Sequence, residues 1–388
     1  MSVARLLARQ GGTTLLVLLA TASPAEAQLR LSGQADILAK SGADERGLNR
    51  NFRLDSPFSQ IRARLFAQHW LTDDVGVFME AFVDSESDPR LNGGYIVINN
   101  VRGHEWLSIR AGMAPSLIGN FGLRSTYFNS NPLIGVPLAW QHRTTLDAAG
   151  LTTASDLLRR RESNVISLPI LYDACWNLQW EFMGEVGMFE YSVGITPGSM
   201  SNPMQSSNEA GVQVLGRAGL VPLPELRLGV SAGVGPYIGG PNRDPLTTAT
   251  SFPGGPADYD QRLVGIDAEY SLGRAILFAE AYHSSWEVPL VAEDLSALAG
   301  YVEGRYDFLP EWFGAARIGS MIFSDITVED GLQSITTGWD DDVLRVESSL
   351  TYRWARELQV RVDWQHTRFL TGEEEPVDLL ALQVRAVF

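Results

Sequence analysis

The sequence predicts an all-β protein: a transmembrane antiparallel β-barrel of about sixteen strands, with short periplasmic turns and long outer loops. Three observations predict this fold class. The chain begins with a segment typical of exported proteins, and it ends on a strand in which apolar residues alternate with polar ones. Between these ends, short and long connections alternate along the whole chain.

The N-terminus has the pattern of a signal peptide. Arg5 and Arg9 give a positive start, residues 15–20 form a short apolar core, and residues 25–27 place alanine at the two positions that a signal peptidase recognises. A membrane-spanning helix needs about 20 apolar residues, so this core is too short to be one. We expect cleavage before Gln28; a buried N-terminal helix is the alternative.

After a signal peptide of residues 1–27, residues 28–388 are long enough for two ordinary domains or for one large barrel, and we expect the barrel. No later stretch has the apolar length of a membrane helix, and barrel strands need none because they alternate lipid-facing and lumen-facing residues. Cys175 is the only cysteine, so no disulfide forms within the chain. The net charge of −16 argues against nucleic acid as a partner, because binding phosphates calls for a basic face.

The C-terminal strand carries the strongest single signal. Every second residue from Leu380 to Phe388 is apolar, and Gln383 and Arg385 lie between them, where they would point into a lumen. The segment resembles the terminal strand of outer-membrane barrels of Gram-negative cells, whose final aromatic residue is recognised by the barrel-assembly machinery. The resemblance implies an outer-membrane location and contact of Phe388 with that machinery. A periplasmic β-sandwich that ends in a strand is the alternative.

Upstream, the same alternation recurs in pairs of segments. Residues 344–354 and 358–365 both alternate, and a tight connection at Ala355-Arg356 joins them. Other short turns are predicted near residues 72–74, 102–105, 184–186, 221–225, 273 and 309–311. Longer connections cover residues 41–56, 85–93, 114–173, 197–207, 239–260, 288–295, 325–342 and 370–377. These seven turns and eight loops imply sixteen strands, with both termini in the periplasm.

Tryptophan placement fits a lipid setting. Five tryptophans fall near predicted strand ends, where interfacial girdles flank the apolar band of a barrel. They are Trp70, Trp106, Trp286, Trp312 and Trp354. Packing in a soluble core is the alternative for any one of them.

The predicted inward positions are strongly charged, and this bears on function. They are Arg62, Arg64, Arg110, Arg217, Arg227, Asp267, Glu269, Glu303, Arg305, Arg345, Glu347, Arg361 and Asp363. Sixteen strands leave a lumen wide enough for water, which keeps such charges solvated, and the charges then set the field that ions feel. We therefore expect a passive channel for ions or small polar solutes, without cofactor or covalent chemistry. Paired charges in a plugged barrel are the alternative.

Residues 114–173 form a connection far longer than usual, and apolar residues recur through it. We expect this segment to fold into the lumen as a constriction. Its basic residues are Arg124, His142, Arg143, Arg159, Arg160 and Arg161. A basic constriction would favour anions over cations, whereas a solvated outer face is the alternative for the arginine run.

The start of this segment carries a family resemblance. Residues 110–115 (RAGMAP) and 119–122 (GNFG) resemble the strand-to-loop pattern of the phosphate-selective and related porins. The resemblance implies a porin in which a loop near this position narrows the lumen, as in general porins, and in which a homotrimer is the usual state. It does not assign phosphate as the solute.

The sequence contains only weak indications of an enzyme. His283-Ser284-Ser285 lies near a predicted outer strand end, but Trp286 and Glu287 follow, so the His-x-Ser-Asn-Gly order of outer-membrane phospholipases is absent. Residues 340–342 are three aspartates; an acidic rim that holds divalent cations or meets lipopolysaccharide explains them more simply than a protease site. We expect no catalytic, cofactor or metal residues. A non-conducting structural or adhesive barrel, and a channel for a hydrophobic or large solute, remain open.

Overall fold

The computed structural model describes most of the predicted mature chain. The described residues are 29–42, 48–50, 56–85, 88–126, 131–147, 153–163, 165–172, 176–201, 211–239, 256–330, 333–371 and 375–388. The predicted signal peptide and its cleavage before Gln28 lie outside them.

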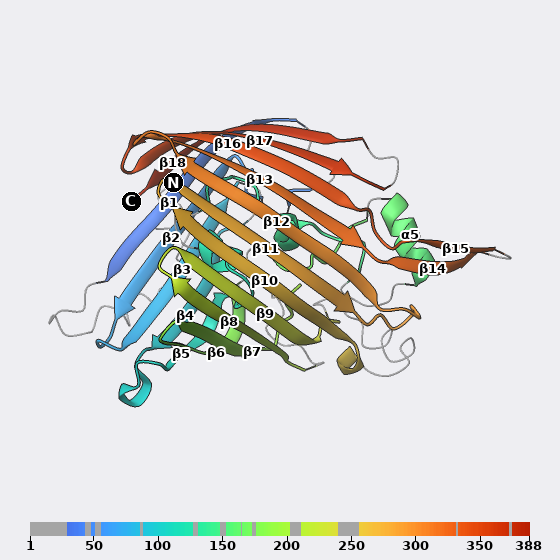
Figure 1. Ribbon diagram of the computed structural model, residues 1–388, viewed down its shortest axis with the longest axis horizontal. Helices are drawn as coiled ribbons and strands as arrows, with labels where there is room; N and C mark the ends of the chain where they lie inside the picture. The colour runs from blue at the N-terminus through green and yellow to red at the C-terminus, as the bar shows by residue number, and fades with distance from the viewer. Residues whose placement is uncertain are drawn as a thin grey trace.

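Within the described residues, sixteen strands close into one antiparallel barrel, which confirms the predicted fold class and strand number (Figure 1). The strands of the barrel are β1 (Arg30–Ser41), β2 (Ile61–Trp70), β3 (Val75–Asp84), β4 (Arg90–Ile98), β5 (Ser108–Pro115), β6 (Trp176–Val186), β7 (Phe189–Thr196), β8 (Gln213–Leu223), β9 (Leu226–Pro236), β10 (Asp260–Leu272), β11 (Ala275–Trp286), β12 (Leu295–Asp307), β13 (Trp312–Phe323), β16 (Val343–Ala355), β17 (Leu358–Phe369) and β18 (Val377–Val387). Each strand pairs with its neighbour in the chain, except that β13 pairs with β16 and β18 closes on β1.

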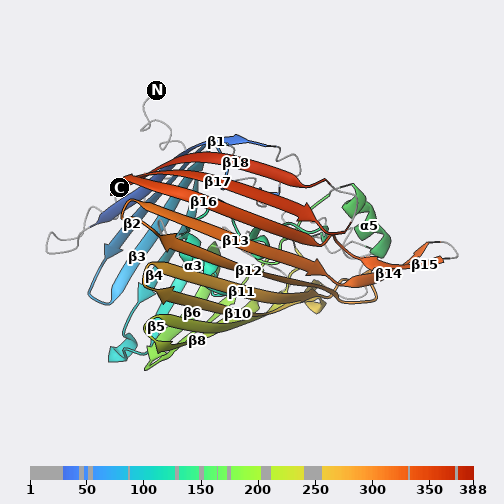
Figure 2. The ribbon, with the colours of Figure 1, turned by 45° about the horizontal axis from the view of Figure 1, so that its top comes forward.

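The segment between β13 and β16 contains a β-hairpin, whereas the sequence predicts a loop over residues 325–342. β14 (Asp325–Asp330) pairs with β15 (Gln333–Gly338) in a separate two-stranded sheet. The hairpin projects beyond the barrel wall at the end opposite the chain's C-terminus (Figure 2). Ile326 and Val328 are buried, so one face of β14 packs inward while the hairpin extends the outer rim.

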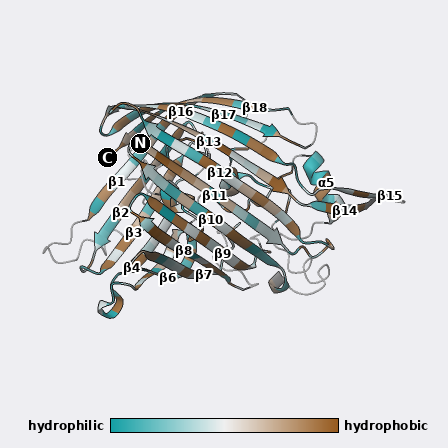
Figure 3. Ribbon diagram, viewed as in Figure 1, coloured by the Kyte–Doolittle hydropathy of each residue, from teal (hydrophilic) through white to brown (hydrophobic). Residues whose placement is uncertain are grey.

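Closure of the barrel follows from the two-residue alternation of β18. Ile37 faces Val384 and Asp36 faces Arg385 across the β1–β18 pair. The apolar partners lie outside and the charged partners inside, where Arg385 donates to Asp36 over 2.7 Å. Apolar positions recur in this way around the barrel (Figure 3), and they form the band that faces lipid.

Short turns gather at the end that holds the C-terminus. Gly33 and Phe388 exchange backbone hydrogen bonds of 2.7 and 3.0 Å at this end. The turn predicted at residues 184–186 is wrong by about two residues. β6 continues to Val186, and the chain reverses at Gly187, whose φ of +61° suits glycine.

Residues 116–172 contain α3 (Phe121–Thr126), α4 (Leu138–Gln141) and α5 (Ala154–Glu162). Their apolar side chains join those of the inward wall in one buried cluster, in which Phe121 packs on Trp140 and Trp140 packs on Tyr282 of β11. A hydrophobic core therefore lies inside the barrel, against the wall from β8 to β16. None of the helices among the described residues has the length and apolarity needed to cross a bilayer.

That internal core corrects part of the predicted tryptophan girdle. Trp286 is fully buried and packs on Trp339 with ring centroids 5.9 Å apart. Trp70 packs against Gly76 on the inward face. Trp354 is exposed on the outside, as the girdle requires. Its ring contacts Tyr352, and Tyr352 in turn contacts Trp312. The periodicity of a single strand did not reveal that a loop would return to cover Trp286.

Candidate functional site in the barrel lumen

An ion-pair ladder crosses the inward faces of β12, β13 and β16. Arg317 donates to Glu303 over 2.9 Å and to Glu347 over 2.6 Å, and all three side chains are buried. Arg124 of α3 also donates to Glu303, so the ladder reaches the internal segment. Arg317 was missing from the predicted inward residues, although Phe313 and Ala315 already mark its strand's inward period.

Glu280 of β11 fixes the start of the internal segment. Its carboxylate accepts the backbone N–H groups of Asn120 and Phe121, both at 2.7 Å, and the indole N–H of Trp140 at 3.2 Å. Gly119 precedes these donors with φ +60°, and a Cβ there would lie 1.9 Å from the hydroxyl of Tyr282. Only glycine therefore allows the chain to approach β11 this closely.

β17 holds the tip of the segment, residues 131–135. Asp363 accepts the N–H of Ile134 at 3.0 Å, and Arg361 donates to Thr351 and to the carbonyl of Asn131. The carbonyl of Gly135 accepts from Arg317 at 2.7 Å. These contacts bring Glu347, Arg361 and Asp363 of the predicted site together on one wall.

A second segment reaches the same wall from the β1–β2 connection. Arg345 is buried, donates to Thr367 at 3.0 Å and lies 3.5 Å from the carbonyl of Leu48. Asn49 donates to Gln365 at 2.8 Å. Residues 48–49 and 131–135 therefore both narrow the space beside β16 and β17.

The wall from β2 to β6 carries another set of predicted residues. Arg62 lies 3.8 Å from Asp84 and Arg64 lies 3.4 Å from Glu80, measured between nitrogen and oxygen. Arg110 donates to Glu181 over 2.5 Å. Both Arg62 and Arg64 approach the ring of Phe82, as does Arg90 at 4.6 Å. Three guanidinium groups thus converge on one aromatic ring, a favourable cation–π arrangement.

The arginine run of the internal segment is placed elsewhere. α5 begins at a capping box between Thr153 and Asp156 and lies beside β14 and β15, near the outer rim (Figure 1). Arg159 is 74% exposed and pairs with Asp156. Arg160 donates to Asp147 over 2.9 Å, and Arg161 donates to the carbonyl of Gly338 over 2.5 Å. The structure therefore separates these three residues from Arg361 and from Arg62.

His142 and Arg143 directly follow α4 in the internal segment. Arg143 forms a backbone bridge with Pro169, inside the segment itself. His142 is buried, and burial together with the charges of Arg345 and Arg143 lowers the pKa of its imidazole to about 3. His142 is therefore neutral at physiological pH and adds no positive charge to the lumen.

The predicted acidic rim is engaged in hydrogen bonds. Asp340 accepts the N–H of Thr145 at 2.7 Å and that of Asp341 at 2.8 Å, and burial raises the pKa of its carboxyl to about 7. Asp342 accepts the N–H of Phe323. Across the described residues, no group of three or more His, Cys, Asp or Glu side chains is arranged to hold a metal ion.

His283 and Ser284 lie on opposite faces of β11. His283 is exposed on the lipid side, whereas Ser284 is buried in the lumen and accepts from Gln261 at 3.1 Å. A nucleophile and a base on opposite faces of a sheet cannot exchange a proton directly.

A closed barrel with an apolar outer surface and a charged inner surface defines an outer-membrane β-barrel protein, because only such a closed sheet satisfies every strand's backbone within a bilayer. Solved structures with the same fold include OmpT of Vibrio cholerae in a trimer form, with a TM-score of 0.55, 12% identity, and coverage of 93% of this chain and 99% of that one. An anion-selective porin from Comamonas acidovorans has a TM-score of 0.57 and 10% identity, over 94% and 100% of the two chains. The outer membrane channel DcaP of Acinetobacter baumannii has a TM-score of 0.54 and 14% identity, over 94% and 99%. No family model and no curated protein matches the chain.

Proposed function

We propose that this protein is a passive channel of the porin type for ions or small polar solutes. The observation that carries the proposal is the partial exposure of inward charged side chains near both ends of the barrel. Arg62 and Arg64, near the outer loops, have side chains that are 15% and 20% exposed. Arg227 and Arg353, near the turns, are 45% and 30% exposed. Since lipid surrounds the barrel, we propose that water reaches these groups from the two mouths of the lumen.

The internal core sets the proposed path. It fills space against the wall from β8 to β16, and residues 131–135 narrow the lumen beside β17. The passage would then run along the β2–β6 wall, past Arg62, Arg64 and Arg110. Residues 114–173 would form the constriction, and Arg159, Arg160 and Arg161 of α5 would lie at the outer entrance.

Pairing limits the selectivity that we expect. Buried partners neutralise many of the inward arginines, as Glu303 and Glu347 do for Arg317. Around Phe82, however, three guanidinium groups face two carboxylates, Glu80 and Asp84. One excess positive charge supports a mild preference for anions. No phosphate substrate is assigned, and the resemblance to phosphate-selective porins extends only to the strand-to-loop segment.

No covalent chemistry is part of the proposal. We propose a homotrimer in lipid that contains lipopolysaccharide, assembled through recognition of Phe388. The V. cholerae barrel with the same fold is known in a trimer form, which supports the oligomer.

The test is conductance of the refolded mature protein in a planar bilayer, with a salt gradient across it. Stepwise openings with a reversal potential on the anion side are expected. A correctly folded barrel that never conducts would overturn the proposal and favour a structural or adhesive role.

A further inference from the structure

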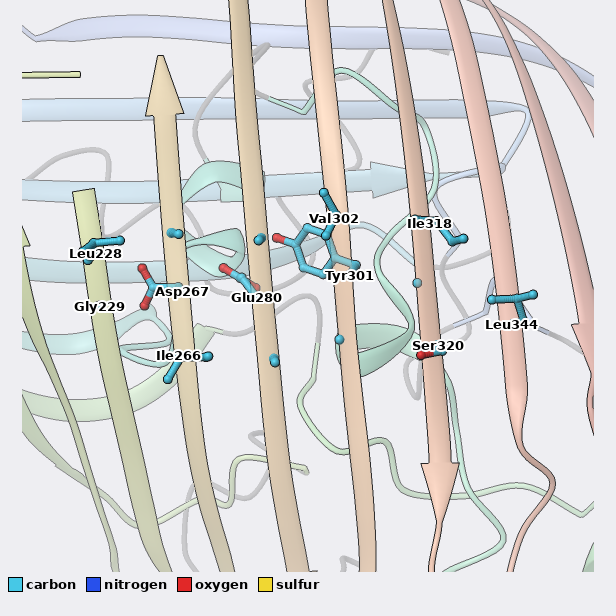
Figure 4. A pocket seen from close by; sticks show the side chains of 15 residues that line it. Leu228, Gly229, Ile266, Asp267, Glu280, Tyr301, Val302, Ile318, Ser320 and Leu344 are labelled. Atoms are coloured by element: carbon cyan, nitrogen blue, oxygen red, sulfur yellow. The ribbon is translucent and has the colours of Figure 1, made fainter. Parts of the chain in front are cut away.

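A trough of about 680 Å³ lies on the outer face of the barrel, across β9 to β13 and β16 (Figure 4). Its floor is made of small residues that share the outward face. They are Ala268, Ala279, Ala281, Gly300 and Ser320. Leu228 and Ile266 bound one end, and Ile318 and Leu344 bound the other.

Most residues that line the trough point towards lipid, although Asp267, Glu280 and Tyr301, which point into the lumen, also border it. Ile266, Val302 and Ile318 are 62%, 55% and 52% exposed on the outer surface. Their chain neighbours Asp267 and Arg317 are buried on the inner surface, because side chains alternate along a strand. The trough is thus continuous with the apolar band that lipid covers.

Strand register aligns the floor into a row. Ala281 faces Gly300, Gly300 faces Ser320, and Ser320 faces Leu344. Strands about 4.8 Å apart make a row across six of them about 24 Å long. Because barrel strands tilt by about 40°, the row is inclined and descends about 15 Å. That depth equals one leaflet of a hydrocarbon core about 30 Å thick.

A positive charge stands at the upper end of this row. Leu344, next to the outer-loop end of β16, faces Arg368 of β17. Arg368 is exposed on the outer face, and within the described part of the chain no hydrogen bond or ion pair involves its side chain. Nearby, Asp378 is engaged by His366 at 3.0 Å and by Trp364 at 3.1 Å. A guanidinium group at this level matches a lipid phosphate.

We propose that the trough and Arg368 bind one phosphate-bearing lipid of the outer leaflet. One acyl chain lies along the floor, where small side chains let its methylene groups contact the sheet closely, and the headgroup phosphate contacts Arg368. The inclined row, the apolar walls and the charge at the outer end all fit an amphiphile of this polarity. The proposal is independent of whether the lumen conducts.

The experiment is native mass spectrometry of the delipidated mature protein, titrated with diphosphorylated lipid A. The double variant Ala281→Leu/Ser320→Leu fills the trough, and Arg368→Gln removes the charge. Ala232→Leu is the control, because Ala232 lies on the outward face of β9 outside the trough. Heat-modifiable migration on a gel reports whether each variant folds.

We expect one tightly bound lipid A per chain in the wild type and in Ala232→Leu. Affinity should fall about tenfold in the double variant and in Arg368→Gln, which corresponds to ~1.4 kcal/mol for each. Unchanged binding by the folded double variant would overturn the acyl-chain site. Equal binding of phosphatidylglycerol and lipid A would overturn the outer-leaflet source. Cross-linking of two chains through cysteines placed in the trough, without bound lipid, would assign the trough to a second copy instead.

Discussion

The backbone N–H of Ile134 donates to the carboxylate of Asp363 over 3.0 Å, and so ties the tip of a long connection to β17. Replacement of Asp363 by leucine removes this acceptor inside the barrel. Loss of a typical hydrogen bond costs about 0.5–1.5 kcal/mol, so residues 131–135 should detach more often. We expect noisier single-channel current and faster proteolysis within residues 131–147. Asp378→Leu, on the outer face, is the control; equal proteolysis in the two variants would contradict the anchoring role.

Gly119 and Gly187 allow a test of close approach that separates it from backbone strain. Both have φ near +60°, yet a Cβ at Gly119 would lie 1.9 Å from the Tyr282 hydroxyl, and one at Gly187 would meet nothing within 4 Å. Gly187→Ala should therefore cost only the ~1–2 kcal/mol of a left-handed residue. Gly119→Ala should cost clearly more, because the segment must also move away from β11.

Urea unfolding in lipid vesicles measures both costs. If both alanine variants lower the urea midpoint by the same amount relative to the wild type, the segment tolerates displacement from β11.

The barrel was predictable because one physical rule, the two-residue alternation of a strand between lipid and water, acts locally at every position. The faces of β18, with Gln383 inside and Leu382 outside, follow from it directly. The partners of the inward charges do not follow from this alternation. Glu280 meets Asn120 from 160 positions away, and that contact depends on how residues 116–172 fold as a unit.

The fold of the internal segment also explains why Arg159, Arg160 and Arg161 lie apart from the inward arginines of the wall. Arg159, Arg160 and Arg161 form one run in the sequence, but the capping box at Thr153 starts a helix there, and a helix turns adjacent residues to different sides. The hairpin of β14 and β15 carried a local signal in the alternation of Ile326 and Val328, which the polar surroundings obscured.

Asp340 makes the attachment of residues 144–146 depend on pH. Burial raises the pKa of this carboxyl to about 7, above its ordinary value of 3.8. The folded state therefore favours the protonated form: its contribution to stability is complete below about pH 4 and is lost as the pH rises through 7. Protease cleavage near Thr145 should accelerate between pH 6 and 8. Asp340→Asn, which cannot ionise, should show a flat profile over this range, and a persistent slope in that variant would assign the effect to another group.

His142 should give the opposite slope at lower pH. Burial beside Arg345 and Arg143 lowers the pKa of its imidazole to about 3, so the folded state favours the neutral ring. The contribution of His142 is complete above about pH 6.5 and is lost as the pH falls towards 3. Amide hydrogen exchange of residues 138–142 should quicken from pH 6 to pH 4, after correction for intrinsic rates. In His142→Gln this acceleration should be absent; if it remains, the carboxylates of the wall are its source.

Arg62 and Arg64 are expected to govern ion preference more strongly than the arginines of α5. With both changed to glutamine, only Arg90 remains beside Glu80 and Asp84 around Phe82, so the local excess changes from positive to negative. A unit charge about 4 Å from an ion contributes about 1 kcal/mol in water, so the loss of two charges should lower the anion-to-cation permeability ratio by at least about fivefold. Reversal potentials at low salt measure this ratio, because screening weakens the effect at 1 M. Arg159→Gln is the matched control, since its side chain is exposed near the outer rim and already pairs with Asp156. A larger shift from Arg159→Gln than from the Arg62/Arg64 pair would place the selective region at the outer entrance and not along the β2–β6 wall.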